Sequence, residues 1–347
     1  MYPGLAVAQA LRDVGDPEIV YVGGSGGIEE QLTKRAAVPF VGIPAGGVHG
    51  LAPQVAVQNL FKSMRGTRAA YRLGRRQRPS ALFATGGYAS VPVALAARLL
   101  RVPILVYLPD IEPGLAVRFI ARLAKKVAVT VEDSAQYFPR RHVVTTGYPV
   151  RAEFRDVDRK RAREELELTE KDPVLLVMGG SRGARSLNRS IVEVLEQLLE
   201  MAQVVHLSGE LDWSWVCQRR DALPQRLTRR YHAVPYVHDM GYVLAAADLA
   251  LCRAGASTLG EMPFFALPAV LVPYPHAWRY QRVNAEWLAN RGAAVTLPDE
   301  QLQDHLLPTL RQLLTDRARL ERMGARARSL SRPDAAARLA QVLLTLA

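Results

Sequence analysis

The sequence predicts an α/β protein of two domains, each built around a parallel sheet. Three observations predict this fold. Short apolar runs alternate with helix-length amphipathic segments along the chain, which is the pattern of consecutive β–α–β units. A polar, highly charged stretch over residues 151–172 separates two series of such runs. At 347 residues the chain is long enough for two domains that each bury a core of their own.

Apolar runs of strand length, with helix-length spacing between them, predict the buried strands. In the first series these runs are residues 18–22, 81–85, 104–108 and 127–131. In the second series they are residues 174–178, 203–208, 231–234, 249–252, 269–272 and 293–296. We therefore expect a first domain over residues 1–150 and a second over residues 151–330. A C-terminal helix is expected over residues 331–347, with Pro333 near its start, where proline is tolerated.

The chain opens directly on a helical pattern. Residues 3–11 have the composition of the first turns of a helix, and no strand stands ahead of them. In a parallel sheet such a helix follows a strand and a loop. Either the first β–α unit is abbreviated or the sequence starts inside it, and we favour the second interpretation.

Positive charge is concentrated in the first half of the chain. Of the net charge of +12, residues 1–150 carry +9, from 18 Lys and Arg against 9 Asp and Glu. No acidic residue occurs between Glu30 and Asp110. Such a surface suits an anionic membrane, a nucleic acid or a phosphorylated substrate. Because no RRM, KH or helix-turn-helix signature accompanies the charge, we expect no nucleic-acid partner.

Composition excludes several other classes of protein. Apolar residues make up 49% of the chain, which indicates a folded globular protein. Cys217 and Cys252 lack metal-ligand spacing, which fits a reducing cytoplasm and implies no cofactor. The most apolar run, residues 90–108, contains two arginines and two prolines and is a poor membrane span. No signal peptide is recognisable.

An amphipathic stretch over residues 55–78 combines apolar and basic positions. Leu60, Phe61 and Met64 lie near one end, and arginines 65, 68, 72, 75 and 76 follow at helical spacing. Such a helix can lie on an anionic membrane surface. The alternative is a solvated basic face on an ordinary surface helix.

The most informative motif is a glycine-rich turn after the run at 174–178. It reads Gly179-Gly180-Ser181-Arg182-Gly183-Ala184 and leads into a helix. Glycines allow close backbone approach, and the N–H groups at a helix start attract phosphate, with the Ser181 hydroxyl as a further donor. The alternative is a turn that packing alone requires. The motif matches neither a P-loop nor G-x-G-x-x-G.

A second cluster of small residues follows the run at 249–252. It reads Arg253-Ala254-Gly255-Ala256-Ser257-Thr258-Leu259-Gly260-Glu261. Backbone and hydroxyl groups here can donate to a ligand, and Glu261 can accept two hydrogen bonds from a ribose diol. Alternatively, Ser257 and Glu261 only cap the helix start.

The sequence Asp156-Val157-Asp158 resembles a metal-binding D-x-D motif. It lies in a charged segment just ahead of a helix that is expected to begin near Arg159. We therefore expect Asp158 to cap that helix, and we expect no catalytic metal.

Taken together, these motifs resemble those of the bacterial peptidoglycan N-acetylglucosaminyltransferases of glycosyltransferase family 28. The resemblance covers nearly the whole chain. Besides the two clusters above, it rests on Pro3-Gly4-Leu5-Ala6, Thr85-Gly86-Gly87-Tyr88-Ala89-Ser90, Gly147-Tyr148-Pro149-Val150-Arg151, Asp239-Met240, and Val272-Pro273-Tyr274-Pro275-His276 followed by Gln281 and Asn284-Ala285.

The resemblance implies a GT-B fold, in which two Rossmann-like, doubly wound domains face a cleft. It also implies that the second domain holds UDP-N-acetylglucosamine. Carried over by position, Arg151 and the Val237 backbone face the uracil, Glu261 the ribose, and Ser181 with Gly180 the diphosphate. Residues Ala256, Ser257, Thr258, Leu259, Gly260 and Gln281 contact donor phosphate and sugar, and Gly86, Gly87 and Tyr88 lie on the acceptor side.

The chain departs from the family pattern at several positions. The family begins with a strand and a glycine loop ending in His, its suspected base, ahead of the residues that match Met1 to Gly4. We expect a misplaced start or a truncated gene. Asp110, in Tyr107-Leu108-Pro109-Asp110, replaces a sugar-contacting Asn and is a candidate base; capping of the next helix is the alternative. Trp278-Arg279-Tyr280 puts the sugar's identity in doubt.

The function implied is inverting transfer of N-acetylglucosamine from UDP to an undecaprenyl-linked muramoyl-pentapeptide during peptidoglycan synthesis. The lipid acceptor favours membrane docking of residues 55–78, so we expect a cytoplasmic enzyme peripheral on the inner face of the cell membrane. One alternative is another GT-B enzyme, either a different lipid glycosyltransferase or a UDP-N-acetylglucosamine epimerase. The other is a non-catalytic paralogue that binds UDP-sugar.

Overall fold

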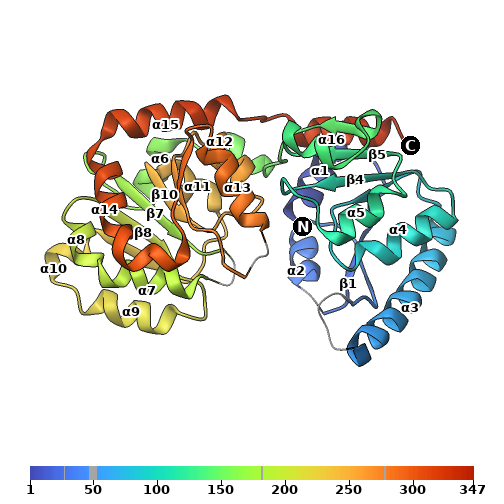
Figure 1. Cartoon of the computed structure of the whole chain (residues 1–347), viewed down its shortest axis with the longest axis horizontal. Coiled ribbons are helices and arrows are strands. Elements are labelled where there is room, and N and C mark those ends of the chain that lie inside the picture. The colour runs from blue at the N-terminus through green and yellow to red at the C-terminus, as the bar shows by residue number, and fades with distance from the viewer. Residues whose placement is uncertain (27, 47–52, 181–182, 277–278) are drawn as a thin grey trace. The chain divides into compact units, whose positions relative to one another are not determined.

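The computed structural model divides the chain into two compact units (Figure 1). Unit 1 comprises Met1–Ala152 together with Pro333–Ala347, and unit 2 comprises Glu153–Arg332. The structure describes residues 1–26, 28–46, 53–180, 183–276 and 279–347. The C-terminal helix belongs to the same unit as the start of the chain, so the chain crosses between the units twice.

Unit 1 contains two parallel sheets. One has the order β3-β4-β5-β6, and the other pairs β1 with β2. The strands are β1 Tyr21–Gly24, β2 Phe40–Ile43, β3 Leu82–Ala84, β4 Ile104–Leu108, β5 Lys126–Val129 and β6 Val143–Thr145. The helices are α1 Tyr2–Arg12, α2 Ile28–Arg35, α3 Pro53–Gln77, α4 Ser90–Leu99, α5 Leu115–Ala121, η1 Glu132–Tyr137, η2 Arg140–His142 and α16 Ala335–Leu344.

Helices cover both faces of the four-stranded sheet. On one face α1 and α16 bury Val7, Leu339 and Leu343 against Leu105 and Tyr107 of β4. On the other face α4 and α5 pack against the alternate β4 side chains, because successive residues of a strand point to opposite faces. Helix α4 also contacts both β1 and β3, the neighbouring members of the two sheets.

Unit 2 is built on one six-stranded parallel sheet of order β12-β11-β10-β7-β8-β9. The strands are β7 Val174–Met178, β8 Gln203–Leu207, β9 Tyr231–Val234, β10 Leu249–Cys252, β11 Ala269–Leu271 and β12 Ala294–Thr296. The helices are η3 Ala152–Asp156, α6 Arg159–Glu165, α7 Arg185–Glu193, α8 Leu195–Leu199, α9 Trp213–Asp221, α10 Gln225–Thr228, α11 Met240–Ala246, α12 Thr258–Phe264, α13 Tyr280–Ala289, η4 Asp299–Gln301, α14 Leu302–Thr315 and α15 Arg317–Ser329.

The unit 2 sheet reverses its winding direction at β7. From β7 the chain proceeds outward through β8 and β9, then returns to β10 on the other side of β7 and continues to β11 and β12. Helices α7 to α10 and α14 lie on one face, and α6 and α11 to α13 lie on the other (Figure 1). Both units are therefore doubly wound α/β structures with parallel sheets, which confirms the expected fold class.

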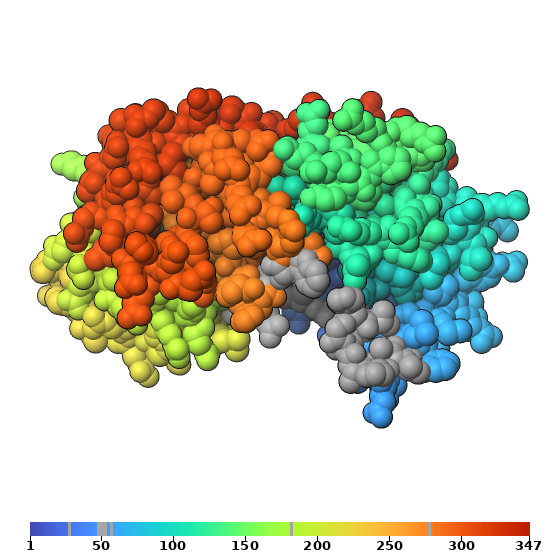
Figure 2. All heavy atoms as spheres, in the orientation of Figure 1, coloured from blue at the N-terminus to red at the C-terminus, as the bar shows by residue number. Residues whose placement is uncertain are grey.

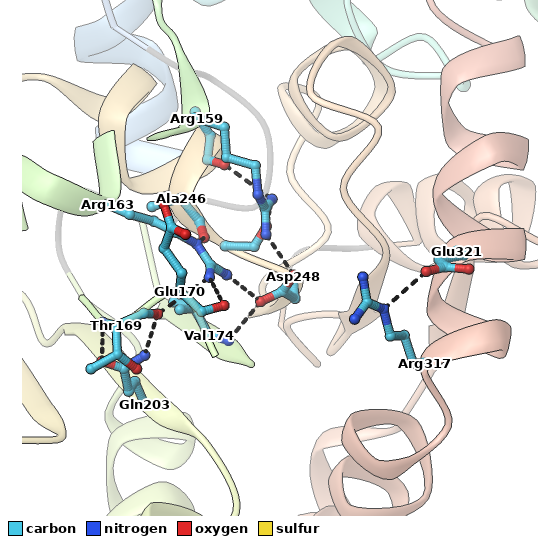
Figure 3. A network of polar contacts seen from close by, with 12 residues as sticks. Arg159, Arg163, Thr169, Glu170, Val174, Gln203, Ala246, Asp248, Arg317 and Glu321 are labelled. Carbon is cyan, nitrogen blue, oxygen red and sulfur yellow. Dashed lines mark hydrogen bonds and ion pairs between the residues drawn. The ribbon is translucent and has the colours of Figure 1, made fainter. Parts of the chain in front are cut away.

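A polar network lies at the amino-terminal edge of the unit 2 sheet (Figure 3). Arg163 of α6 donates to Asp248, just ahead of β10, at 2.6 Å, and its side chain is only 8% exposed. Asp248 also accepts from the Val174 backbone N–H at the start of β7, at 2.7 Å. By contrast, the Arg317–Glu321 pair on α15 is exposed and contributes little to stability, about 0.3–0.5 kcal/mol.

Four of the expected strands have the expected bounds: β4, β7, β9 and β10. Asp158 caps α6 by accepting from the Arg161 N–H at 2.9 Å, as predicted. The run at 18–22 was placed too early, because Ile19 packs into the core between α1 and α16 while pairing with β2 begins at Tyr21. Strands β2 and β6 were missed; they are four and three residues long.

Two neighbouring helix ends offer a matched test of backbone strain. Helices α12 and α13 both end in a Schellman turn, closed by Leu267 N–H to Met262 O and by Ala293 N–H to Leu288 O. The left-handed residue is Ala266 in one turn (φ 52°) and Gly292 in the other (φ 73°). Only glycine adopts this conformation without steric cost.

We expect Ala266→Gly to stabilise the protein by about 0.5–1 kcal/mol and Gly292→Ala to destabilise it by about 1 kcal/mol. A Cβ at Gly292 would meet Arg326 Cγ at an ordinary 3.6 Å, so the second cost comes from the backbone alone. Thermal unfolding followed by circular dichroism measures both shifts. A lower melting temperature for Ala266→Gly would show that packing of the Ala266 methyl outweighs the strain.

Candidate functional site

The carboxyl-terminal edge of the unit 2 sheet brings the two sequence motifs together. In the register of the sheet, Met178 of β7 lies beside Cys252 of β10, and both are the last residues of their strands. The glycine-rich turn after β7 therefore starts next to the small-residue cluster after β10. This is the point where the strand order reverses, and open α/β sheets bind ligands in the crevice at such a point.

The glycine-rich turn is held against the sheet by two of its glycines. A Cβ on Gly179 would lie 2.2 Å from the Ala184 nitrogen, and one on Gly183 (φ +76°) would lie 2.4 Å from the Ser208 carbonyl oxygen. Packing explains these two residues. Gly180 (φ +85°) differs, because within the described residues a Cβ there would meet no atom within 4 Å. The turn therefore leaves open space at Gly180, as a ligand-binding turn requires.

Helix α7 begins directly after this turn. Its N-cap residue, Ala184, has no side chain that can cap, so the first N–H groups of the helix are not satisfied by a cap. The free N–H groups and the positive end of the helix dipole favour an anion at this place. Ser181, predicted to donate to the same anion, lies outside the described residues.

A buried polar network supports the turn from behind. Asn188 of α7 donates to the Ser208 carbonyl at 2.8 Å and to Asp212 at 2.9 Å. Its oxygen lies 2.9 Å from His206 Nε2, and His206 Nδ1 lies 2.7 Å from the Tyr231 hydroxyl. Asn188 Oδ1 can only accept, so His206 Nε2 carries a proton. Burial favours the neutral imidazole, in which Nδ1 accepts from the Tyr231 hydroxyl.

The electrostatics of this network follow from burial. Burial lowers the pKa of His206 to about 4. Burial alone would raise the pKa of Asp212, but hydrogen bonds from Asn188, Arg185 and Trp215 outweigh it, and the pKa of Asp212 lies below its usual value. These residues are structural supports for the turn. Sequence reasoning missed them, although the polar Asn188 within an apolar helix face was a visible signal.

The second cluster presents polar groups at the start of α12. Ser257 is the N-cap residue, but its side chain caps no backbone N–H, so the part of the capping alternative that involves Ser257 is wrong. Thr258 Oγ1 donates to the Gly255 carbonyl at 2.7 Å. Glu261 is 8% exposed in the first turn. Of the remaining predicted positions, Ala256 is half-buried, and Leu259 and Gly260 are buried.

Arg253 connects the loops at this edge. Its guanidinium donates through Nη2 to Ser186 Oγ at 2.6 Å and through Nη1 to Asp299 Oδ1 at 2.5 Å. Ser186 Oγ in turn donates to Asp299 Oδ1 at 2.8 Å. Nη1 also donates to the Val272 carbonyl at 3.2 Å, and the guanidinium lies 5.3 Å from the centre of the Tyr274 ring. We call Ser186, Arg253, Tyr274 and Asp299 the Arg253 cluster.

Two amide side chains of α13 hold the loops after β10 and β11. Gln281 Oε1 accepts from the Tyr274 N–H at 2.9 Å, so this predicted sugar contact also shapes the loop. Asn284 is fully buried and donates to the Ala254 carbonyl at 3.2 Å. The segments after β10 and β11 are thereby joined. Sequence reasoning assigned no role to Asn284.

Two predicted donor contacts do not belong to the β7, β10 and β11 loops. Val237 is half-buried beyond the end of β9, two strands from β7, or roughly 10 Å at ordinary strand spacing. Arg151 belongs to unit 1, where its guanidinium stacks 4.2 Å from the centre of the Tyr2 ring. The other described donor residues gather at the β7, β10 and β11 loops of unit 2.

The predicted acceptor residues follow β3 in unit 1. Gly86 (φ +87°) and Gly87 (φ +83°) are consecutive left-handed residues, a conformation that favours glycine. Ser90 Oγ donates to the Gly86 carbonyl at 2.5 Å, and a Cβ on Gly86 would lie 2.8 Å from Val117 Cγ2. Tyr88 is 60% exposed beside them. The turn presents an aromatic side chain to solvent.

Asp110 follows the neighbouring strand, β4. Thr130 Oγ1 contacts the Leu108 carbonyl at 3.1 Å and the Pro109 carbonyl at 2.8 Å, which fixes the backbone just ahead of Asp110. The N-cap residue of α5 is Gly114, which has no side chain with which to cap the helix. Its carboxylate stands at the carboxyl-terminal edge of the unit 1 sheet, on the same edge as Gly86 and Gly87.

A cavity of about 450 Å³ in unit 1 lies at the opposite, amino-terminal edge of the sheet. Arg98, Arg101 and Lys125 line it, but the C-terminal ends of α4, α5 and α16 also meet there. The negative ends of these helix dipoles account for the cations, so the cavity is a poor phosphate site.

Within the ranges that the structure describes, no group of three His, Cys, Asp or Glu side chains is placed to hold a metal ion. The described helices include none with the length and apolar character needed to span a bilayer.

The buried histidine predicts a pH dependence of stability. Because the pKa of His206 falls from 6.5 to about 4 on folding, the unfolded chain binds a proton more readily between these values. The contribution of neutral His206 to the free energy of unfolding is complete above pH 6.5. It is lost as the pH falls toward 4, at up to about 1.4 kcal/mol per pH unit. We expect His206→Gln to flatten this slope in thermal unfolding at a series of pH values.

The matched control is His305→Gln, which replaces an exposed histidine on α14 and should leave the slope unchanged. Equal slopes for the wild type and His206→Gln would contradict a neutral, buried His206.

Comparison with known proteins gives the family. The glycosyltransferase family 28 N-terminal domain matches residues 1–129, and the family 28 C-terminal domain matches residues 174–339. A Roseiflexus protein, a UDP-N-acetylglucosamine--N-acetylmuramyl-(pentapeptide) pyrophosphoryl-undecaprenol N-acetylglucosamine transferase, is 42% identical over 100% of this chain and 92% of its own length.

Solved structures agree in fold. The crystal structure of Acinetobacter baumannii MurG superposes with a TM-score of 0.78 at 29% identity, covering 99% of this chain and 95% of that one. A UDP-GlcNAc 2-epimerase from Neisseria meningitidis, with a TM-score of 0.69 at 12% identity over 99% and 96% of the two chains, shares the fold alone. On the family matches and the full-length identity, the chain belongs to glycosyltransferase family 28.

Proposed function

We propose that this protein transfers N-acetylglucosamine from UDP-N-acetylglucosamine to the undecaprenyl-pyrophosphoryl N-acetylmuramyl-pentapeptide of peptidoglycan synthesis, with inversion at the sugar. The named relative, which matches over the whole chain, supports the reaction. The structural observation that carries the proposal is the meeting of the β7 and β10 loops at the switch point of unit 2. That edge offers phosphate-binding N–H groups beside a buried carboxylate, as a nucleotide-sugar requires.

We assign each part of the donor to the predicted residues whose chemistry suits it. Glu261 accepts from the ribose hydroxyls, and Gly180, Ser181 and the start of α7 hold the diphosphate. Arg151 and the backbone of Val237 are assigned to the uracil. The remaining contacts to donor phosphate and sugar are assigned to Ala256, Ser257, Thr258, Leu259, Gly260 and Gln281.

The reaction displaces UDP from the anomeric carbon. The acceptor hydroxyl loses its proton to a base as its oxygen forms the new bond, and the leaving diphosphate takes the electron pair of the bond that breaks. Oriented N–H groups at α7 stabilise the charge that develops on UDP, so the proposal requires no metal ion or other cofactor. Asp110 is the candidate base, and Gly86, Gly87 and Tyr88 are assigned to the acceptor side.

The test is transfer with purified protein, UDP-N-acetylglucosamine and the lipid-linked acceptor. We expect UDP release to require the acceptor, whereas an epimerase would convert the donor alone and a binding paralogue would release none. In Glu261→Ala, loss of hydrogen bonds to a charged group should weaken UDP binding by about 10- to 100-fold in calorimetry.

Glu164→Ala is the matched control, because that carboxylate is exposed on α6 in the same unit. Unchanged UDP affinity in a folded Glu261→Ala protein would remove Glu261 from the ribose site.

We also infer that α3 docks unit 1 on the anionic cytoplasmic face of the membrane. Leu60, Phe61 and Met64 are 55%, 62% and 60% exposed, which is unusual for large apolar side chains so close together. The arginines at 65, 68, 72, 75 and 76 follow on the same helix and are exposed. In the space-filling view, blue atoms of α3 stand at the outer margin of unit 1 (Figure 2). Apolar contact and headgroup attraction thus come from one element.

Replacing Arg65, Arg68 and Arg72 together by Ala should weaken sedimentation with vesicles of anionic phospholipid by roughly 100-fold, at about 1 kcal/mol for each charge. The control replaces Arg317, Arg322 and Arg328 of α15, which removes the same charge from unit 2. Equal losses in the two triple variants would mean that net charge, and not α3, determines binding.

A further inference from the structure

We propose that Arg253 is a positioning residue that fixes the donor-binding loops of unit 2 before UDP-N-acetylglucosamine arrives, without contacting the donor itself. The inference rests on the proposed function and deepens it. It assigns a role to a residue for which the family resemblance implied none.

The Arg253 cluster joins the loops after four strands. Arg253 follows β10, Ser186 lies in the first turn of α7 beyond β7, Tyr274 follows β11, and Asp299 follows β12. Those four strands are consecutive in the sheet order β12-β11-β10-β7. One side chain therefore connects the segments that follow four consecutive strands of the six-stranded sheet.

The contacts of Arg253 are directed at protein groups. Its side chain is 10% exposed, and its charge is balanced by the Asp299 carboxylate, itself 18% exposed. The guanidinium donates to a hydroxyl, a carboxylate and a backbone carbonyl, and a flat fork of five N–H groups can serve all three at once. With its charge neutralised and its donors directed to the loops, Arg253 positions its neighbours and leaves the phosphate to α7.

The segments that Arg253 holds are those assigned to the donor. Ser186 stands two residues beyond the N-cap of α7, whose first N–H groups are assigned to the diphosphate. Arg253 itself precedes Ala256, Ser257 and Thr258 in the same loop. The Tyr274 backbone N–H donates a hydrogen bond to the Gln281 side chain. If these segments were not held in place, UDP binding would have to order them. The free energy of ordering would then lower the affinity for UDP.

A second partly buried Arg–Asp pair in the same unit provides a matched control. Arg163 and Asp248 form a 2.6 Å ion pair with side chains 8% and 28% exposed, and they hold α6, β7 and β10 at the amino-terminal edge (Figure 3). This pair has the same chemistry and similar burial, but it lies at the other end of the strands. Its loss should affect stability and not the donor loops.

The experiment compares Arg253→Lys with Arg163→Lys, which keep the charge but lose the fork. UDP affinity is measured by calorimetry, and melting temperature is measured in parallel. We expect Arg253→Lys to raise the Kd for UDP by about 10-fold and the KM for the sugar donor similarly, with kcat within about threefold of wild type. Arg163→Lys should lower the melting temperature while the Kd stays within about twofold.

Ser186→Ala tests the connection directly, because its hydroxyl belongs to the cluster. It should raise the Kd for UDP by about threefold alone and have no further effect in the Arg253→Lys background. Equal UDP affinity in Arg253→Lys and wild type, or the same change in both lysine variants, would overturn the positioning role. The variants could change UDP affinity in this pattern while the wild-type protein transfers no sugar. That result would overturn the proposed reaction and leave the positioning role standing.

Discussion

The parallel pairing of β7 with β10 is the interaction on which the site in unit 2 depends. It places Met178 beside Cys252, so that two segments more than 70 residues apart in sequence begin their loops at the same point. All five residues of β7 are buried, so a shift of one residue in this register would exchange the side chains that pack on the two faces of the sheet and disrupt the packing on both. The core therefore fixes the register, and the register brings the glycine turn to the small-residue cluster.

Buried polar groups then hold loops that the core does not reach. At the amino-terminal edge Asp248 accepts from Arg163 and from the Val174 N–H, and at the carboxyl-terminal edge Asp299 accepts from Arg253 and Ser186. Removing one partner of such a pair leaves a charge with little water around it, which is costly. The same chemistry thus serves two ends of one sheet, to join strands at one edge and to join loops at the other.

Sequence predicted the fold and much of the site because both depend on local patterns. Apolar runs such as 174–178 are fully buried strands. Glycines in a turn indicate positions where the backbone takes a positive φ or approaches another group closely. The Arg253 cluster could not be found in this way, because Arg253 and Asp299 are 46 residues apart and meet only through the order of the strands. The link between Asn188 and His206 was missed for the same reason. Strands β2 and β6 have mostly half-buried side chains, so they lack the fully buried character of strands such as β7.

The two units use electrostatics differently, and this separates binding of the donor from docking. Residues 1–150 carry +9 of the net charge of +12, and α3 spreads part of it over an exposed surface where salt screens it. In unit 2 the diphosphate is assigned to fixed N–H dipoles at a glycine turn, supported by neutral or paired groups. Ordered dipoles at close range are screened much less than surface charges. If α3 docks on the membrane as proposed, its attraction to lipid should vary with lipid charge and salt while the proposed donor site keeps its affinity.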